Sequence, residues 1–392
     1  MSTLTNPSTP SPQSNSNAVT WANPQREAAF RAWFAEIAAA LELQATSLRL
    51  ASADASFRRY LRIDGHAGSY IIMDAPPEKE NCQPFVHVAT LMEAAGLNVP
   101  RVLAWQQEQG FMLLSDLGHQ TMMQVINPQQ PTANQALYQQ AVTALIQWQK
   151  ASQPGVLPNY DAALLRRELE LFPEWYLGQH RGIAVEGEIR ATLNTLFNLI
   201  VARNLAWPSV YVHRDFMPRN LITPTLVAAR TALPPEEAVP CLGRPGAAAS
   251  LSSGNERLGV LDFQDAVYGP ITYDIASLMR DAFLSWGEDF VLDITIRYWQ
   301  QARAADLPVG EDFGAFYQGV EWMGLQRHLK VAGIFARLSL RDGKPHYLAD
   351  TPRFIGYIRA TASRYQELKP LLRLIDQVEG IESVSSYAFG RV

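Results

Sequence analysis

The residues most able to do chemistry lie in two short polar segments, each of which follows an apolar run. In the first, His213, Asp215 and Asn220 have the spacing His-x-Asp-x-x-x-x-Asn. In a catalytic loop of this form, the aspartate accepts the proton of an attacking hydroxyl and the asparagine holds Mg²⁺. The second segment, Asp262-Phe263, ends another apolar run, where the same chemistry places its main metal ligand. Together the two segments predict a site for phosphoryl transfer.

The residue types in these segments suit that reaction. The migrating phosphoryl group is highly charged and loosely bonded in its transition state, so positioning and charge neutralisation dominate catalysis. Asp262 and Asn220 offer the hard oxygen ligands that Mg²⁺ prefers, and Asp215, as an aspartate at neutral pH, can accept a proton. A His-Arg-Asp segment alone is explained equally well by a salt-bridged turn. The two segments together, in this order, favour the catalytic interpretation.

The composition indicates a folded globular protein. Its 392 residues are 47% hydrophobic, which allows two domains with substantial cores. The net charge is −5 and the 33 Lys and Arg residues are spread along the chain, so we expect no nucleic-acid partner. The 2 cysteines are far apart, which excludes a disulfide framework and fits a reducing cytoplasm. No run approaches the roughly 18 apolar residues of a membrane span, and we take the protein to be a cytoplasmic monomer.

The chain before residue 116 is expected to form a small lobe. Residues 1–23 are rich in Ser, Thr, Pro, Asn and Gln without a basic start or an apolar run, which predicts a disordered tail rather than a signal peptide. Helical spacing of apolar residues follows at 24–43. Five runs with strand character, and a helix at 83–96 between the third and the fourth, complete the predicted nucleotide-binding lobe, 24–115.

Two parts of this lobe are candidates for contact with a nucleotide. A turn of small residues between the first two strands would let backbone amides approach phosphate oxygens, although an ordinary hairpin turn explains it too. The connector after the fifth strand offers backbone groups that can hydrogen-bond an adenine edge, although it is also simply a turn. The candidate nucleotide contacts in these two parts are Ser52, Ser56, Phe57, Arg58, Leu114 and Asp116.

The third strand, 69–74, departs from the kinase pattern. A kinase places its phosphate-binding lysine here, whereas this chain has Met73. The charge of the phosphates must then be met by another cation. Arg58, Arg59 and Lys79 are the candidates, and each of them can equally be a surface cation.

Beyond residue 116 the pattern becomes mainly helical and predicts a larger catalytic and acceptor-binding lobe, 116–392. The two short strands that carry the aspartate motifs are expected to form a small hairpin, with the active site in the cleft between the lobes. Residues 223–257 interrupt that hairpin with Pro, Ala, Gly and Ser and are interpreted as a flexible insertion. The helices are expected at 133–150, 161–178, 186–205, 273–283, 288–304, 310–340 and 351–378.

Several segments resemble the aminoglycoside phosphotransferase and choline kinase superfamily, and more closely its bacterial kinases of the cell-wall sugars N-acetylmuramate and N-acetylglucosamine. The resemblance runs from about residue 24 to near the C-terminus. The segments that carry it are Asp-Ala-Ser-Phe-Arg-Arg-Tyr at 54–60, Ile-Met-Asp-Ala-Pro-Pro at 72–77, the loop 213–220, 262–274 and 324–337. The resemblance implies a bilobal, protein-kinase-like α+β fold and the use of ATP and Mg²⁺.

The resemblance also implies an activity and residue roles. Kinases of this group phosphorylate the anomeric C1 hydroxyl of the amino sugar, which feeds the recycling of peptidoglycan precursors. By likeness, Asp215 is the base, Asn220 and Asp262 bind Mg²⁺, and Asp274 braces the catalytic loop with His213. A favourable charge at a helix N-terminus is another explanation of Asp274. The candidate contacts to the amino sugar are Trp175, Arg219, Gln264, Asp265, Arg327 and His328.

Other functions stay open as alternatives. A protein kinase would carry a lysine where Met217 lies, which favours a small-molecule acceptor of the sugar, aminoglycoside, choline or homoserine type. A nucleotide-binding pseudokinase would explain the missing strand lysine, but a pure binder has no use for Asp215. A polycationic aminoglycoside would need an acidic groove, whereas a carboxylate-bearing sugar suits basic residues of the C-terminal lobe. These are Arg166, Arg167, Arg181, Arg327, His328 and Lys330.

Overall fold

In the computed structural model of the protein, the chain divides into two compact units. The first unit is formed by residues 1–90 and 100–117, and the second by 91–99 and 118–392. Among the described residues, no helix is both long and apolar enough to cross a membrane. The structure describes residues 19–53, 57–224 and 257–381.

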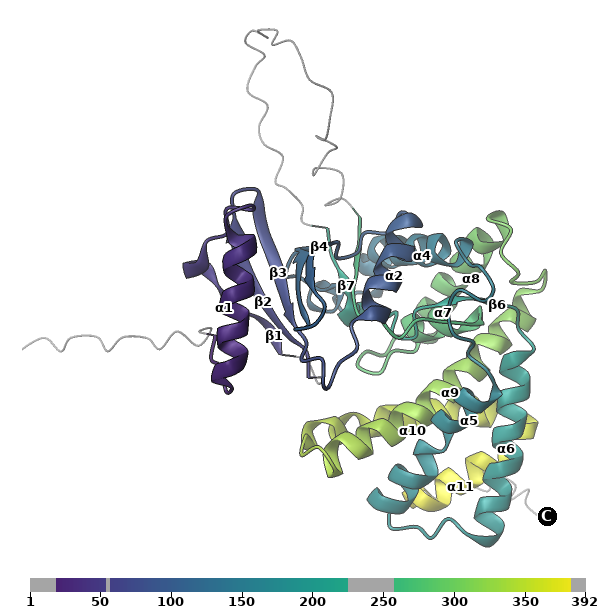
Figure 1. The fold of residues 1–392 in the computed structure, drawn as a ribbon. Coiled ribbons are helices and arrows are strands. Elements are labelled where there is room, and N and C mark those ends of the chain that lie inside the picture. Colours follow the sequence, from purple (N-terminus) through teal and green to yellow (C-terminus); the bar gives the residue numbers. More distant parts are fainter. Residues whose placement is uncertain (1–18, 54–56, 225–256, 382–392) are drawn as a thin grey trace, which may run out of the picture. The chain divides into compact units, whose positions relative to one another are not determined.

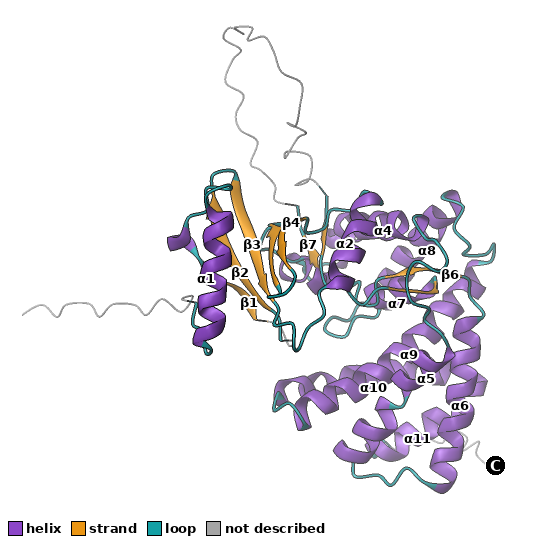
Figure 2. Ribbon diagram, viewed as in Figure 1, coloured by secondary structure: helices purple, strands orange, loops and turns teal. Residues whose placement is uncertain are grey.

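The first unit is built around an antiparallel sheet of five strands, the number predicted from the sequence. The strand order is β1-β2-β3-β5-β4, so β1 and β4 form the edges (Figure 2). Met73 pairs with Tyr60 on one neighbouring strand and with Met112 on the other, and its side chain is fully buried. The strands are β1 (Arg49–Ala53), β2 (Arg59–Gly65), β3 (Gly68–Asp74), β4 (Val102–Gln106) and β5 (Phe111–Ser115).

Helix α1 (Pro24–Ala38) packs against this sheet (Figure 1). The Asn23 side chain caps the helix by accepting hydrogen bonds from two backbone amides of the first turn, where a proline is also well placed. Phe30 and Trp33 are buried and pack on Phe111, with ring centroids 5.7 and 5.4 Å away. Burial of large apolar side chains stabilises such a core by roughly 1.5–3 kcal/mol each. The helix is shorter than the predicted 24–43.

The packed chain begins before α1, within the predicted tail 1–23. Trp21 packs on Phe30, with ring centroids 4.8 Å apart, and the guanidinium of Arg59 lies 4.0 Å from the centroid of the Trp21 ring. Residues 19–23 therefore belong to the folded unit, and residues 1–18 lie outside the described part of the chain. The prediction rested on the average composition of residues 1–23, which does not reveal that the single residue Trp21 packs on the fold.

The second unit is mainly helical, as predicted, with the 28-residue helix α9 packed against α7, α10 and the π-helix η3. Gly333 of α9 allows a close approach, because an added Cβ would lie 2.3 Å from the carbonyl oxygen of Leu171. Helix α2 (Gln83–Ala94) begins in the first unit and ends in the second. The other helices are α3 (Met122–Val125), α4 (Gln135–Lys150), α5 (Ala162–Leu169), η3 (Phe172–His180), α6 (Gly187–Leu205), α7 (Thr272–Met279), α8 (Glu288–Ala304), α9 (Phe313–Leu340), α10 (Thr351–Arg364) and α11 (Lys369–Glu379).

Two predicted helices are broken in the structure. The segment 161–178 forms α5 and then the π-helix η3, and Pro173 lies in the first turn of η3. The segment 351–378 forms α10 and then α11, and Pro370 lies in the first turn of α11. Proline has no backbone N–H and clashes with the preceding turn, so it is tolerated where a helix starts and breaks a continuous one.

The short strands that carry the aspartate motifs pair differently from the prediction. Strand β6, which precedes Asp215, pairs with β9, and β8, which precedes Asp262, pairs with β7. The predicted hairpin between β6 and β8 is therefore wrong. Of the predicted insertion 223–257, residues 225–256 lie outside the described residues. The strands are β6 (Ser209–Val212), β7 (Leu221–Ile222), β8 (Gly259–Val260) and β9 (Val267–Pro270).

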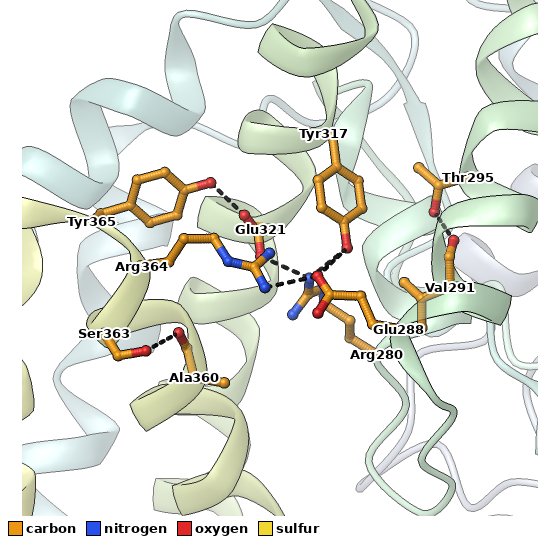
Figure 3. A network of polar contacts seen from close by, with 10 residues as sticks. All are labelled: Arg280, Glu288, Val291, Thr295, Tyr317, Glu321, Ala360, Ser363, Arg364 and Tyr365. Atoms are coloured by element: carbon orange, nitrogen blue, oxygen red, sulfur yellow. Dashed lines mark hydrogen bonds and ion pairs between the residues drawn. The ribbon is translucent and has the colours of Figure 1, made fainter.

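A polar network centred on the buried carboxylate of Glu321 connects the helices around α9 (Figure 3). Glu321 of α9 accepts hydrogen bonds from Arg280 at 3.0 Å, from Arg364 at 2.5 Å and from the hydroxyl of Tyr365. Arg364 also pairs with Glu288 of α8 at 2.7 Å. Because its members come from the end of α7, the start of α8, α9 and the end of α10, the network fixes these helices against one another.

Candidate active site

His213 connects the two aspartate segments. It follows β6 and is buried, and its Nε2 lies 3.0 Å from the carbonyl oxygen of Leu261, the residue before Asp262. Its Nδ1 accepts a hydrogen bond from the backbone amide of Asp215 at 3.2 Å. Burial lowers the pKa of His213 to about 4, so the ring is neutral, with its proton on Nε2 to donate to Leu261.

Asp274 holds the backbone of the catalytic loop. Its two carboxylate oxygens accept hydrogen bonds from the amides of His213 at 2.7 Å and Arg214 at 3.0 Å. Arg214 has a φ of +76°, which is a strained conformation for a residue with a side chain. Burial raises the pKa of Asp274 to about 7. The geometry suits the bracing role that the family resemblance implies, and that role stays a prediction.

Asn220 lies between the two aspartates. Its Nδ2 donates to the carbonyl oxygen of Asp215 at 2.9 Å and to Oδ2 of Asp262 at 3.2 Å. The amide of Leu261 donates to the backbone oxygen of Asn220 at 2.9 Å, which holds the second segment against the loop. Asp262 has a φ of +65°, and its Oδ1 accepts a hydrogen bond from Gln264 at 2.9 Å. The three predicted catalytic and metal-binding residues therefore lie together.

The donor set fits a magnesium ion. With Nδ2 of Asn220 donating to the two aspartates, its Oδ1 is the atom of that side chain able to bind a cation. The described residues contain no group of three or more His, Cys, Asp and Glu side chains that could hold a metal. Mg²⁺ is commonly bound by one or two carboxylates together with substrate phosphates and waters, so Asp262 and Asn220 suffice on the protein side.

The loop is also held by a buried carboxylate, Glu168 of α5. Glu168 accepts hydrogen bonds from Arg214 at 2.6 Å, from Lys330 of α9 at 2.9 Å and from the hydroxyl of Tyr160. Burial opposes ionisation, but the charges of Lys330 and Arg214 hold the pKa of Glu168 below its usual value. No motif marks Glu168 or Tyr160 in the sequence, and the spacing of apolar residues assigns them only to helix and loop.

Two neighbouring residues of α9, both predicted to contact the sugar, have different surroundings. Arg327 donates to the carbonyl oxygen of Arg214 at 2.9 Å and lies over the ring of Tyr273, so the structure brings it to the catalytic loop. His328 is buried against Tyr357, with ring centroids 4.5 Å apart, and its Nε2 lies 3.1 Å from the carbonyl oxygen of Arg280. Burial lowers the pKa of His328 to about 3, so this ring is neutral and lies with the helix network.

The remaining predicted sugar contacts are more dispersed. Arg219 is exposed, and its guanidinium lies 4.5 Å from the centroid of the Phe283 ring. Asp265 is exposed, and its backbone oxygen lies 3.4 Å from Nη1 of Arg214. Trp175 is half-buried in η3. Arg219, Gln264 and Asp265 thus belong to the loops that carry the catalytic residues, whereas Trp175 lies in a separate element.

In the first unit, Phe57 and Arg58, which follow the small residues of the predicted phosphate-binding turn, contact the loop that follows β3. The amide of Phe57 donates to Glu80 at 3.2 Å, and Arg58 pairs with Glu80 at 3.0 Å. Phe57 is 64% exposed, and the ammonium of Lys79 lies 4.5 Å from the centroid of its ring. Lys79 is therefore the candidate cation that combines exposure with a contact to Phe57. Ser56 and the side chain of Ser52 lie outside the described residues.

The other nucleotide candidates have partners within the sheet. Arg59 pairs with Asp74 at 2.7 Å, and so does Arg26 of α1 at 2.8 Å. Asp116 accepts hydrogen bonds from Arg62 at 2.6 Å and from the hydroxyl of Ser69 at 2.7 Å. Leu114 is buried in β5 and is paired with Ile71 on one side and Val102 on the other.

The sequence profile of the phosphotransferase enzyme family (APH) matches residues 47–227 and 250–311. The chain belongs to this family. The chain is also 46% identical over 334 residues to the N-acetylmuramate/N-acetylglucosamine kinase of Pseudomonas aeruginosa, with 85% of this chain and 89% of the relative covered. It is 45% identical over 341 residues to the kinase of the same name from Neisseria meningitidis, with 86% and 92% covered. The predicted family and enzyme class are confirmed, and a kinase of this family uses ATP as co-substrate.

Solved structures support the fold. A choline/ethanolamine kinase family protein from Mesorhizobium loti has a TM-score of 0.54 at 13% identity, with 90% of this chain and 99% of that chain covered. The ADP-bound aminoglycoside phosphotransferase APH(2'')-Ib has a TM-score of 0.51 at 13% identity, with 83% and 96% covered. The predicted protein-kinase-like α+β fold is thereby confirmed.

Proposed function

We propose that this kinase transfers the γ-phosphoryl group of ATP to the anomeric C1 hydroxyl of N-acetylmuramate and N-acetylglucosamine, in the recycling of peptidoglycan precursors. The main support is one combination. The chain holds Asp215, Asn220 and Asp262 in a single cluster through contacts of 2.9 and 3.2 Å. It is also 46% identical to a kinase named for these two sugars.

Asp215 is the proposed general base. The C1 oxygen of the sugar attacks the γ-phosphorus of ATP while the bond from that phosphorus to the ADP oxygen breaks, and the hydroxyl proton passes to the carboxylate of Asp215. The backbone of Asp215 is fixed on both sides, because its amide donates to His213 and its carbonyl oxygen accepts from Asn220. This fixation positions the base without using its carboxylate oxygens.

Asn220 and Asp262 are the proposed magnesium ligands. A Mg²⁺ ion held by these two residues would neutralise the negative charge that develops on the leaving ADP. The positive φ of Asp262 and its hydrogen bond from Gln264 hold this carboxylate in one orientation. Phe57 and Lys79, in the first unit, are the proposed contacts to the nucleotide phosphates in place of the missing strand lysine.

We also propose the domain roles and the state of the protein. Residues 24–115 bind the nucleotide and 116–392 carry the catalytic residues and the acceptor. The protein is a monomer of 43.7 kDa, which light scattering after size-exclusion chromatography tests directly. Its proposed place is the cytoplasm, because its co-substrate ATP is supplied there.

Release of ADP from Mg-ATP by the purified protein, measured with a panel of acceptors, tests the activity. We expect turnover with N-acetylmuramate and N-acetylglucosamine and none with an aminoglycoside or choline. N-acetylglucosamine reduced to its sugar alcohol has no anomeric centre and should not be a substrate. The product should lack a reducing end and release phosphate in mild acid, as glycosyl phosphates do.

Each alternative outcome has a distinct meaning. A reducing, acid-stable product would place the phosphate on another hydroxyl and overturn the anomeric assignment. Turnover with only an aminoglycoside or choline would mean that this compound, and not an amino sugar, is the acceptor. Binding of Mg-ATP without turnover on any acceptor would favour the pseudokinase.

A further inference from the structure

Arg219 is the one exposed side chain of the catalytic loop 213–220. It lies in the 3₁₀ turn Pro218–Asn220, directly before the residue whose amide reaches both aspartates. Consecutive Cα atoms are about 3.8 Å apart, so the Cα atom of Arg219 lies about that far from the Cα atom of Asn220, the residue that contacts both aspartates. A group on Arg219 is therefore well placed to touch an acceptor bound at Asp215.

The Arg219 guanidinium lies over an aromatic cluster. Its carbon is 4.5 Å from the centroid of the Phe283 ring. Phe283 contacts Phe335 of α9 at 5.6 Å, and Phe335 contacts Tyr347 at 4.8 Å and Phe354 at 5.0 Å. A guanidinium that stacks on a ring keeps its N–H groups in the plane of the guanidinium, where they can donate to a carboxylate in a two-pronged contact.

The neighbouring cations of the loop are already engaged. Arg214 and Lys330 both pair with Glu168, and Arg327 donates to the backbone oxygen of Arg214. Among the described residues, no carboxylate lies within ion-pair distance of Arg219. The charge of Arg219 acts on the buried carboxyl of Asp281 together with the charges of other arginines, but the two residues form no ion pair.

The acceptors proposed above differ by one charge. N-acetylmuramate is N-acetylglucosamine with a lactyl ether on the 3-hydroxyl, and this ether ends in a carboxylate. We infer that Arg219 recognises the lactyl carboxylate of N-acetylmuramate by a two-pronged ion pair and thereby sets the preference between the two sugars. This inference rests on the proposed sugar kinase activity and names a specificity-determining residue for it.

The test compares kcat/KM for three acceptors in four proteins. The acceptors are N-acetylmuramate, its lactyl carboxamide, which lacks the charge, and N-acetylglucosamine. The proteins are wild type, Arg219→Met, Arg219→Lys and the control Arg303→Met. Arg303 is a matched control because it too is an exposed arginine stacked on a ring, with its guanidinium 4.8 Å from the centroid of the Trp299 ring.

In Arg219→Met, we expect the ratio of kcat/KM for N-acetylmuramate to that for N-acetylglucosamine to fall roughly 10- to 100-fold, the usual effect of losing a charged hydrogen bond. Arg219→Lys should restore part of the ratio, because the charge returns without the two-pronged geometry. Wild type should prefer N-acetylmuramate to its carboxamide by a similar factor, and Arg219→Met should not distinguish them. Arg303→Met should keep the wild-type ratio.

Several results would overturn the inference. An unchanged ratio in Arg219→Met means that another group reads the carboxylate. An equal fall for both sugars with a raised KM for ATP means that Arg219 binds a nucleotide phosphate instead. Activity of wild type on neither sugar would reject the proposed function itself, and this outcome is distinct because it appears before any variant is made.

Discussion

Replacing Glu168 by Gln is expected to destabilise the second unit. Glu168 is 5% exposed and forms ion pairs with Arg214 at 2.6 Å and with Lys330 at 2.9 Å. Glutamine keeps the shape of the side chain but removes the charge, so both cations lose their carboxylate partner in a buried place. Breaking a buried ion pair by removing one partner costs about 3–5 kcal/mol. We therefore expect the free energy of unfolding to fall by about 3 kcal/mol or more.

Glu170→Gln is a matched control from the same region. Glu170 also forms ion pairs with two arginines, Arg166 at 2.9 Å and Arg190 at 2.7 Å, but its side chain is 33% exposed. Ion pairs in contact with solvent contribute about 1 kcal/mol or less. Urea unfolding followed by circular dichroism should separate the two variants clearly. Equal unfolding free energies for Glu168→Gln and Glu170→Gln would refute the reasoning about burial.

The Glu168 variant should also turn over more slowly. Its carboxylate holds the Arg214 side chain, and Arg214 connects Asp274 to Asp215 through its strained backbone. Adding Lys330→Met to Glu168→Gln removes one unpaired cation, so stability should partly return while kcat stays low. A double variant with wild-type kcat would show that the anchor on Arg214 does not serve catalysis.

Four further predictions concern the site and its surroundings. Asp215→Asn should keep the fold and Mg-ATP binding while kcat falls about 10²- to 10⁴-fold, and a loss under threefold would contradict its role as base. Asp262→Ala should weaken both Mg-nucleotide affinity and rate, which a magnesium titration of activity measures. Lys79→Met should raise the KM for ATP several-fold and leave the KM for the sugar unchanged; the opposite pattern would remove Lys79 from the nucleotide site. Burial raises the pKa of Asp281 to about 6, so the folded protein keeps a proton that the unfolded chain loses near pH 4. Stability should consequently weaken as the pH rises from about 4 to about 6, and urea unfolding of Asp281→Asn should lack that part of the pH dependence.

The sequence predicted best what depends on local patterns. The spacing of Asp215, Asn220 and Asp262 predicted a cluster, and the structure brings these residues together, because the Asn220 side chain contacts the backbone of Asp215 and the carboxylate of Asp262. Period and composition likewise predicted a small sheet followed by helices. The strands and helices follow from patterns within short stretches of sequence. The catalytic motifs combine residue types and spacings that few other sites require.

Features that depend on tertiary contacts could not be predicted in this way. The strands β7 and β8 have 2 residues each, too few for a pattern to choose their partners. The close approach of Gly333 in α9 to Leu171 joins segments far apart in sequence, whereas the break that follows Leu171 has a local cause in Pro173. Glu168 meets Arg214 and Lys330 only because three elements converge, so no local signal distinguishes it from a surface glutamate.

The pairing of β7 with β8 determines how well the chain tolerates insertions and deletions between these two strands. The last pair of this ladder, Ile222 with Gly259, lies immediately inside the ends of the segment 223–257. Asn220 and Asp262 are joined on the other side of the same ladder, by the hydrogen bonds between their own segments. The distance between the two proposed metal ligands is thus set by paired backbone rather than by the length of the intervening chain. Because each doubling of a loop adds only about 0.6 kcal/mol of closure cost, insertions and deletions between Thr225 and Asn255 should be nearly neutral, and this connection is a suitable place to graft a tag.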